Sequence, residues 1–103
     1  MSWQEIIREW RKNPPREESV RRVLTVLDNV FENRKDKMQG SHIVVEDSRL
    51  KFYKRNLRPE DRNISYDGSF HIPTIKGRRV KGYNIDKILH LIDIIEAYER
   101  TRQ

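Results

Sequence analysis

The chain has 103 residues, of which 35% are hydrophobic and 37% are charged, so it has room for one domain with a small core. Its formal net charge of +6 favours a polyanionic partner, either nucleic acid or an anionic membrane surface. It has no cysteine, which excludes disulfides and cysteine-based zinc sites, and no apolar run approaches the ~18 residues of a membrane span. Residues 1–5 lack the layout of a signal sequence, so a cytoplasmic protein is expected.

The first predicted element is a helix over residues 3–12. Its large apolar residues follow the i, i+3, i+4, i+7 spacing of one helix face: Trp3, Ile6, Ile7 and Trp10. Ser2 is a candidate N-cap, with Glu5 at the spacing of a capping box. So short a helix is marginal alone, so its apolar face is expected to dock on the core. Residues 1–15 are therefore predicted to be a helical extension of a main domain over residues 16–103.

A second helix is predicted to begin near Arg16, since Pro15 suits the first turn of a helix. Its apolar residues recur at three- and four-residue steps: Val20, Val23, Leu24, Leu27, Val30 and Phe31. Residues 32–39 are polar and fit an edge strand or a loop. The β-branched run 43–45 then favours a strand.

The segment 46–67 is long and charged for a loop, and residues 50–53 within it are predicted to form a short strand or a docked loop. A turn signal, Asp67-Gly68, precedes a predicted strand over residues 69–73.

The last helix is predicted to run from about Asn84, a good N-cap, to about Arg100. Its buried stripe is predicted to be Ile85, Ile88, Leu89, Ile92 and Ile95. Leu91, Ile94 and Tyr98 widen this stripe, which suits packing against the first helix or binding of a protein partner.

Helix, helix, two or three strands and a last helix indicate an α+β domain with an antiparallel two- to three-stranded sheet. Helices on one face would leave the other face open, where a polyanion suits a basic protein. The strand residues expected to face the helices are Ile43, Val45, Phe70 and Ile72. Alternation then turns His42, Val44 and His71 toward the open face. If the strands are neighbours, both histidines lie on one surface, although the register is left open.

Four motifs in this order resemble the HicA family of bacterial toxins, and the match spans Arg16 to Ile95. They are Gly40-Ser41-His42, Phe70-His71-Ile72-Pro73, Val80-Lys81-Gly82-Tyr83 and Ile85-Asp86-Lys87-Ile88-Leu89. The resemblance implies a small α-β-β-β-α fold similar to double-stranded-RNA-binding domains. It also implies a ribonuclease that cleaves mRNA and is held inactive by a HicB antitoxin. The family's catalytic residue is the histidine of the Gly-Ser-His motif, which is His42 here.

Metal-independent RNA cleavage fits these residues, because a histidine can exchange a proton near neutral pH and activate the ribose 2′-OH. His42 is the candidate catalytic residue and His71 is a second candidate. The candidate RNA-binding residues are Gly40, Ser41, Lys76, Arg78, Arg79 and Lys81. No cofactor and no metal are predicted, because His90 with Asp86 and Asp93 fits exposed ion pairs on a polar helix face.

The predicted function is an endoribonuclease toxin, with mRNA and a HicB-like antitoxin as partners; no oligomeric state is indicated. The alternative is a non-catalytic RNA-binding module of the same fold. A third hypothesis is an interaction protein that works through the wide apolar stripe of the last helix. Phe52 and Tyr53 stand among basic residues, so they either stack on unpaired bases or fill the core.

Overall fold

The computed structural model describes residues 1–35 and 41–102 and has an α+β architecture. Its helices and strands, in chain order, are α1 (Trp3–Lys12), β1 (Glu17–Ser19), α2 (Val20–Val30), β2 (Asn33–Arg34), β3 (His42–Glu46), α3 (Ser48–Asn56), β4 (Ser69–Pro73), β5 (Arg79–Lys81) and α4 (Gly82–Thr101). The strands form an antiparallel sheet in the order β2-β3-β4 and a separate antiparallel pair, β1-β5. The predicted α+β class with an antiparallel sheet is confirmed.

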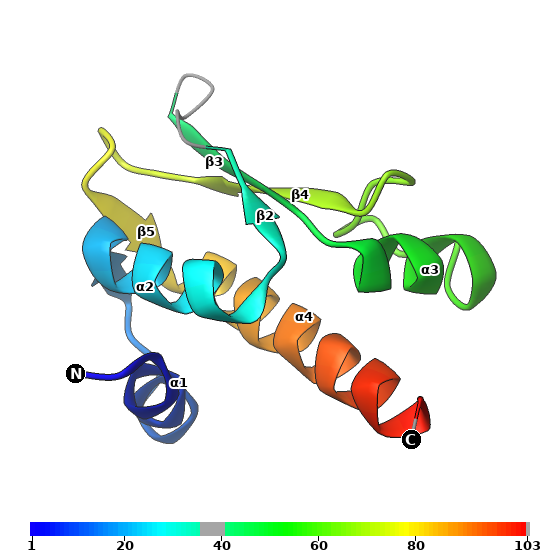
Figure 1. The fold of residues 1–103 in the computed structure, drawn as a ribbon. Helices are drawn as coiled ribbons and strands as arrows, with labels where there is room; N and C mark the ends of the chain where they lie inside the picture. The colour runs from blue at the N-terminus through cyan, green and yellow to red at the C-terminus, as the bar shows by residue number, and fades with distance from the viewer. Residues whose placement is uncertain (36–40, 103) are drawn as a thin grey trace.

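The three-stranded sheet has helices on one side. Figure 1 shows α2 and α4 beneath β2, β3 and β4, with α1 lying further below and no described helix above the sheet. The core fills the space between these layers, and its fully buried members include Val23, Leu27, Ile43, Val45, Phe70, Ile72, Ile85, Ile88 and Ile92. The inward residues predicted from strand alternation are therefore in the core, and His42, Val44 and His71 lie on the opposite face of the sheet.

Helix α1 belongs to the same core. Ser2 Oγ accepts a hydrogen bond from the Glu5 amide at 3.2 Å, and the Ser2 amide donates to Glu5 Oε1 at 3.4 Å, which confirms the predicted capping box. Ile6 and Trp10 are buried in the core cluster. The Trp10 indole N–H donates to Glu18 Oε2 at 2.8 Å, so its one polar group is satisfied. The predicted docking of this helix is confirmed.

The second helix begins at Val20, and the prediction of a start near Arg16 was wrong. Residues 17–19 are extended as β1 and pair with β5, so that Glu17 lies opposite Lys81. Ser19 then caps α2 by accepting a hydrogen bond from the Arg22 amide at 3.3 Å. The extended conformation gains cross-strand hydrogen bonds that one more helical turn would forgo.

The segment predicted as a short strand or docked loop is instead the helix α3. Its N-cap is Asp47, which accepts from the Arg49 amide at 3.0 Å. Beyond α3, Ile64 is buried and Lys54 donates to the backbone oxygen of Asp61, so the following loop is held against the helix. This loop lies at the Glu46–Ser69 end of the β3–β4 pair.

The start of α4 also differs from the prediction. The helix begins at Gly82 with Lys81 as N-cap, which makes Asn84 its third residue. The reason is that β5 runs directly into α4, because the Gly82 amide donates to Arg16 O at 2.8 Å. None of the described helices is both long enough and apolar enough to cross a membrane.

The wide apolar stripe of α4 divides into two parts. Leu91 is fully buried in the core, whereas Leu89 and Ile94 are only partly buried. Ile94 and Tyr98 line an apolar hollow between α3 and α4 together with Phe52, whose ring centroid lies 5.6 Å from that of Tyr98. Phe52 is exposed and Tyr53 packs against the core, so only the second of these two aromatic residues fills the core.

Candidate nucleic-acid interface

The centre of the candidate site is a pair of histidines on neighbouring strands. In the β3–β4 register His42 lies opposite Pro73 and His71 lies opposite Val44, so the histidines occupy diagonal positions on one face of the sheet. Their ring centroids are 5.9 Å apart and the ring planes are inclined at 71°. The expectation that both histidines share one surface is confirmed.

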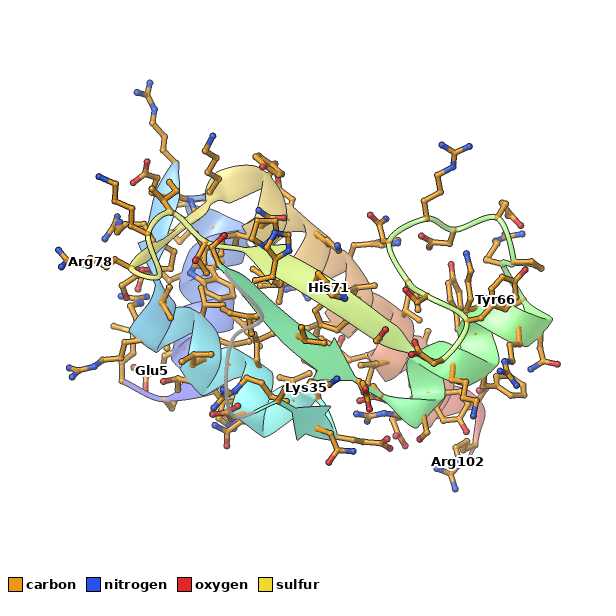
Figure 2. The ribbon with its side chains drawn as sticks, turned by 90° about the horizontal axis from the view of Figure 1, so that it is seen from above. Glu5, Lys35, Tyr66, His71, Arg78 and Arg102 are labelled. Carbon is orange, nitrogen blue, oxygen red and sulfur yellow. The ribbon has the colours of Figure 1, made fainter. Side chains whose placement is uncertain are left out.

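The two imidazoles are free to engage a ligand. His71 is exposed and His42 is half-buried, and neither ring forms a hydrogen bond or ion pair with any residue in the described ranges 1–35 and 41–102. Figure 2 shows His71 on β4, on the face of the sheet that turns away from the helices. A ligand can therefore bind either ring without displacing a hydrogen bond to a described residue.

Val44, expected on the open face, is only 3% exposed. It sits on the central strand, between His71 of β4 and Lys35, whose amide donates to Val44 O at 3.0 Å. Its small side chain is shielded by neighbours on both sides. Lys35 itself is exposed beyond the end of β2 (Figure 2) and was not among the candidates, because a polar segment does not reveal which of its lysines will flank the sheet.

A tight basic hairpin stands at the histidine end of the sheet. Its tip residues Lys76 and Gly77 have φ of 52° and 71°, and the Arg78 amide donates to Ile75 O at 3.0 Å. Positive φ at both central residues is typical of the mirror-image hairpin turns, and glycine adopts it most easily. Lys76 and Arg78 are both exposed at this turn. Figure 2 shows Arg78 projecting into solvent.

Arg79 and Lys81, the other two basic candidates, lie in strand β5 rather than in the turn. Arg79 lies 3.5 Å from a carboxylate oxygen of Glu17 and also donates to Glu17 O at 3.3 Å. Lys81 is exposed and immediately precedes α4. Among the residues that the structure describes, Arg79 is the one of these four cations that pairs with an acidic side chain, although an exposed ion pair of this kind is easily exchanged for a phosphate.

Thr74 connects the histidine strand to the basic hairpin. Its amide and its hydroxyl both donate to Ser41 O, at 2.7 and 2.8 Å, and its Oγ1 accepts from the Gly77 amide at 3.1 Å. Ser41 thus contributes its backbone here, while its side chain is exposed. Gly40, also a candidate, lies outside the described residues. The motifs give no signal for Thr74, whose role depends on the folded arrangement.

Lys87 of α4 makes a hydrogen bond to the backbone of His71. Its Nζ donates to the backbone oxygen of His71 at 3.0 Å, so it covers part of the outer edge of β4. Burial lowers the pKa of Lys87, against the opposing effect of nearby Asp61.

His90 and Asp93, which were considered as metal ligands on the polar face of α4, do not face a common point. His90 lies 3.7 Å from Asp61, and Asp93 pairs with Arg11 at 2.8 Å, so these two residues point to different partners. The described residues contain no cluster of three or more histidine or carboxylate groups that could hold a metal ion.

Comparison of the chain with protein-family models, with curated proteins and with solved structures finds no match. The function is therefore inferred from the motifs and from the arrangement of the side chains.

Proposed function

We propose that the protein is a metal-independent endoribonuclease of the HicA type, which binds mRNA on the open face of its sheet. The observation that carries this proposal is the pair of imidazoles, 5.9 Å apart on one face and beside a hairpin with exposed cations. A phosphodiester that lies across both rings on the open face would be close to two acid–base groups, and catalysis requires each to come within about 2.6–3.2 Å of a reacting oxygen.

The proposed reaction uses the two imidazoles as base and acid. His42 takes the proton of the ribose 2′-OH, and the 2′-oxygen attacks the adjacent phosphorus to form a cyclic phosphate. The bond from phosphorus to the 5′-oxygen breaks, and His71 in its protonated form gives that oxygen a proton. Lys76 and Arg78 would offset the negative charge that develops on the phosphoryl oxygens.

The test of this function is induced expression of the wild type and of His42→Ala in a bacterial host, with growth and mRNA integrity as readouts. Arrested growth and fragmented mRNA for the wild type alone would support the proposal. Unaffected growth and intact mRNA for both proteins, with RNA binding retained in vitro, would favour the non-catalytic RNA-binding module.

RNA affinity should depend on salt through the tip of the basic hairpin. A plot of the logarithm of the association constant against the logarithm of the salt concentration has a negative slope. In Lys76→Ala combined with Arg78→Ala, this slope should become shallower by about 0.7 for each phosphate of a single strand that the variant no longer neutralises. The weakening should be similar for unrelated RNA sequences, because phosphate contacts carry no sequence information. Fluorescence anisotropy at several salt concentrations measures it.

The matched control for the hairpin variant is Arg8→Ala combined with Lys12→Ala, which removes the same charge from exposed positions on α1. This control should retain the wild-type slope. Equal slopes for the hairpin variant and the wild type would show that the hairpin is ordinary surface.

A HicB-like antitoxin is proposed to silence the enzyme by covering the histidine face. An acidic protein suits this basic surface, because complementary charge speeds association and excludes wrong partners. The antitoxin should therefore slow the exchange of backbone amides in residues 41–46 and 69–76, which carry the two histidines. The loop after α3 lies at the opposite end of the β3–β4 pair from His42, so its amides should be less affected. Hydrogen exchange of the complex measures this. Protection restricted to α4, with the strands exchanging as in the free protein, would rule out direct occlusion.

A further inference from the structure

A shallow groove lies between one side of α2 and the tip of the basic hairpin. Its volume is about 690 Å³, and the described residues that line it are Ser19, Val20, Arg21, Leu24, Thr25, Asp28, Asn29, Gly77 and Arg78. The Val20 amide donates to Arg78 O at 3.0 Å, so the hairpin is attached directly to the start of the helix. The two walls of the groove therefore hold each other in place.

Each wall of the groove carries an arginine. Arg21 of α2 and Arg78 of the hairpin are both exposed, and neither side chain forms a hydrogen bond or ion pair with any described residue. The carboxylate among the described lining residues is Asp28, and it accepts from Arg34 Nε at 2.5 Å and from Arg34 Nη2 at 3.1 Å. The groove therefore has an excess of positive charge, which suits an anionic ligand.

The surface between the two arginines is partly apolar. Leu24 is partly buried and packs against the core, and Val20 is 8% exposed. A single-stranded nucleic acid fits such a surface, because it has regularly spaced phosphates with bases and sugars between them. Arginine suits the same ligand, since its planar guanidinium can bind a phosphate through two N–H groups and can stack on a base.

The groove is continuous with the surface that the proposed function assigns to RNA. Gly77 and Arg78 line the groove and also form the hairpin at the histidine end of the sheet. Figure 2 shows Arg78 on the hairpin that continues from the strand of His71. An RNA strand that leaves the histidine pair along β4 would therefore meet the hairpin first and the groove next.

We propose that this groove binds the part of a single-stranded RNA that extends beyond the cleavage site, with Arg21 and Arg78 on its phosphates. The assignment rests on the proposed function, and it adds that the substrate is unpaired and reaches from the histidines to α2. A single strand can bend around the hairpin, whereas a double helix is stiff on the scale of one domain. Binding away from the reacting phosphate would help to position that phosphate between the histidines.

The experiment measures the affinity of a short and a long RNA by fluorescence anisotropy. Both carry 2′-O-methyl riboses, which lack the attacking hydroxyl, and they have about four and about sixteen nucleotides, the range of single-strand sites. Arg21→Ala should weaken binding of the long RNA about tenfold, the loss expected for a charge-assisted hydrogen bond, and should make its salt slope shallower by about 0.7. The short RNA cannot occupy the histidine face and the groove together, so the advantage of the long RNA should shrink in this variant.

The matched control is Arg8→Ala, because Arg8 is exposed on α1 and both changes place alanine, a strong helix former, within a helix. Asn29→Asp is a second variant, which adds a negative charge to the lining of the groove. Its control is Asn63→Asp, which adds the same charge at an exposed position in the loop after α3. Asn29→Asp should weaken binding of the long RNA more than Asn63→Asp does.

The outcomes separate this inference from the proposed function. Unchanged affinity for the long RNA in Arg21→Ala and Asn29→Asp, or equal weakening in their controls, would overturn the groove and leave the histidine site standing. Weakening in these two variants beyond their controls would support the inference, and would do so even if the wild type fails to cleave unmodified RNA, a failure that counts against the proposed catalysis alone. A wild type that binds neither RNA would overturn both.

Discussion

The variant His42→Ala should lose RNA cleavage while keeping its fold. A positioned general base or acid typically contributes about 10²–10⁴-fold to a rate, so single-turnover cleavage should slow by about that factor. The side chain is half-buried, outside the core cluster and without a hydrogen bond to any described residue, so stability should change by only about 0.5 kcal/mol. Cleavage of a labelled RNA in the presence of a metal chelator, with thermal unfolding of the same samples, measures both.

The matched control is His90→Ala, because His90 is exposed on α4 and its ring faces Asp61 rather than the histidine pair. It should cleave at the wild-type rate. His71→Ala should fall between the two if a water molecule can replace the acid but nothing replaces the base. Full activity of His42→Ala at equal concentration would contradict the assignment, and loss of activity only on addition of the chelator would point to a metal-dependent reaction.

Those parts of the fold that depend on local periodicity could be predicted from the sequence. The apolar spacing of α1, α2 and α4, and the alternation in β3 and β4, each arise within one element. Strand β1 could not be found this way, because residues 17–19 are extended only through pairing with residues 79–81. Helix α3 was missed because Leu50, Phe52 and Tyr53 cluster as they would in a strand. Its N-cap Asp47 was a readable signal that the apolar cluster outweighed.

The candidate site likewise has features that follow from local sequence patterns and features that depend on long-range contacts. His42 and His71 could be placed on one face by alternation alone, but their diagonal proximity needed the register of β3 and β4. The contributions of Thr74 and Lys87 depend on backbone oxygens that are 33 and 16 residues away in sequence. Contacts of this range leave no local pattern, so sequence reasoning can suggest the chemistry without identifying the residues that hold it in place.

The largest loss of stability is expected from Asp47→Ala. Asp47 is 2% exposed, and its carboxylate accepts from the Glu32 amide at 3.0 Å and from Arg49 Nε and Nη2 at 2.9 and 2.7 Å. Arg49 in turn donates to Val30 O at the end of α2 and to Glu99 of α4, both at 3.0 Å. The hydrogen bonds that Arg49 donates to Asp47 raise the pKa of Arg49, as expected for a guanidinium held by a buried carboxylate.

Asp47→Ala would leave this guanidinium largely buried beside the single, half-exposed carboxylate of Glu99, and would also leave the Glu32 amide without its acceptor. Removing one partner of a buried ion pair typically destabilises a protein by about 3–5 kcal/mol. The free energy of unfolding, from chemical denaturation, should fall by about 3 kcal/mol, a large part of the roughly 5–15 kcal/mol of a typical domain. Asp28→Ala, which breaks an ion pair whose carboxylate is half-exposed, should cost no more than about 1 kcal/mol.

The decisive comparison is the double variant Asp47→Ala with Arg49→Met. If the destabilisation of Asp47→Ala comes from a buried charge left without its partner, removing that charge as well should restore part of the stability, because an apolar side chain of similar length tolerates burial. If Asp47 acts mainly as the cap of α3 and the acceptor for Glu32, the double variant should be no more stable than the single one. Equal stability of Asp47→Ala and the wild type would contradict both accounts, and would mean that the junction of α2, α3 and α4 is held by apolar packing alone.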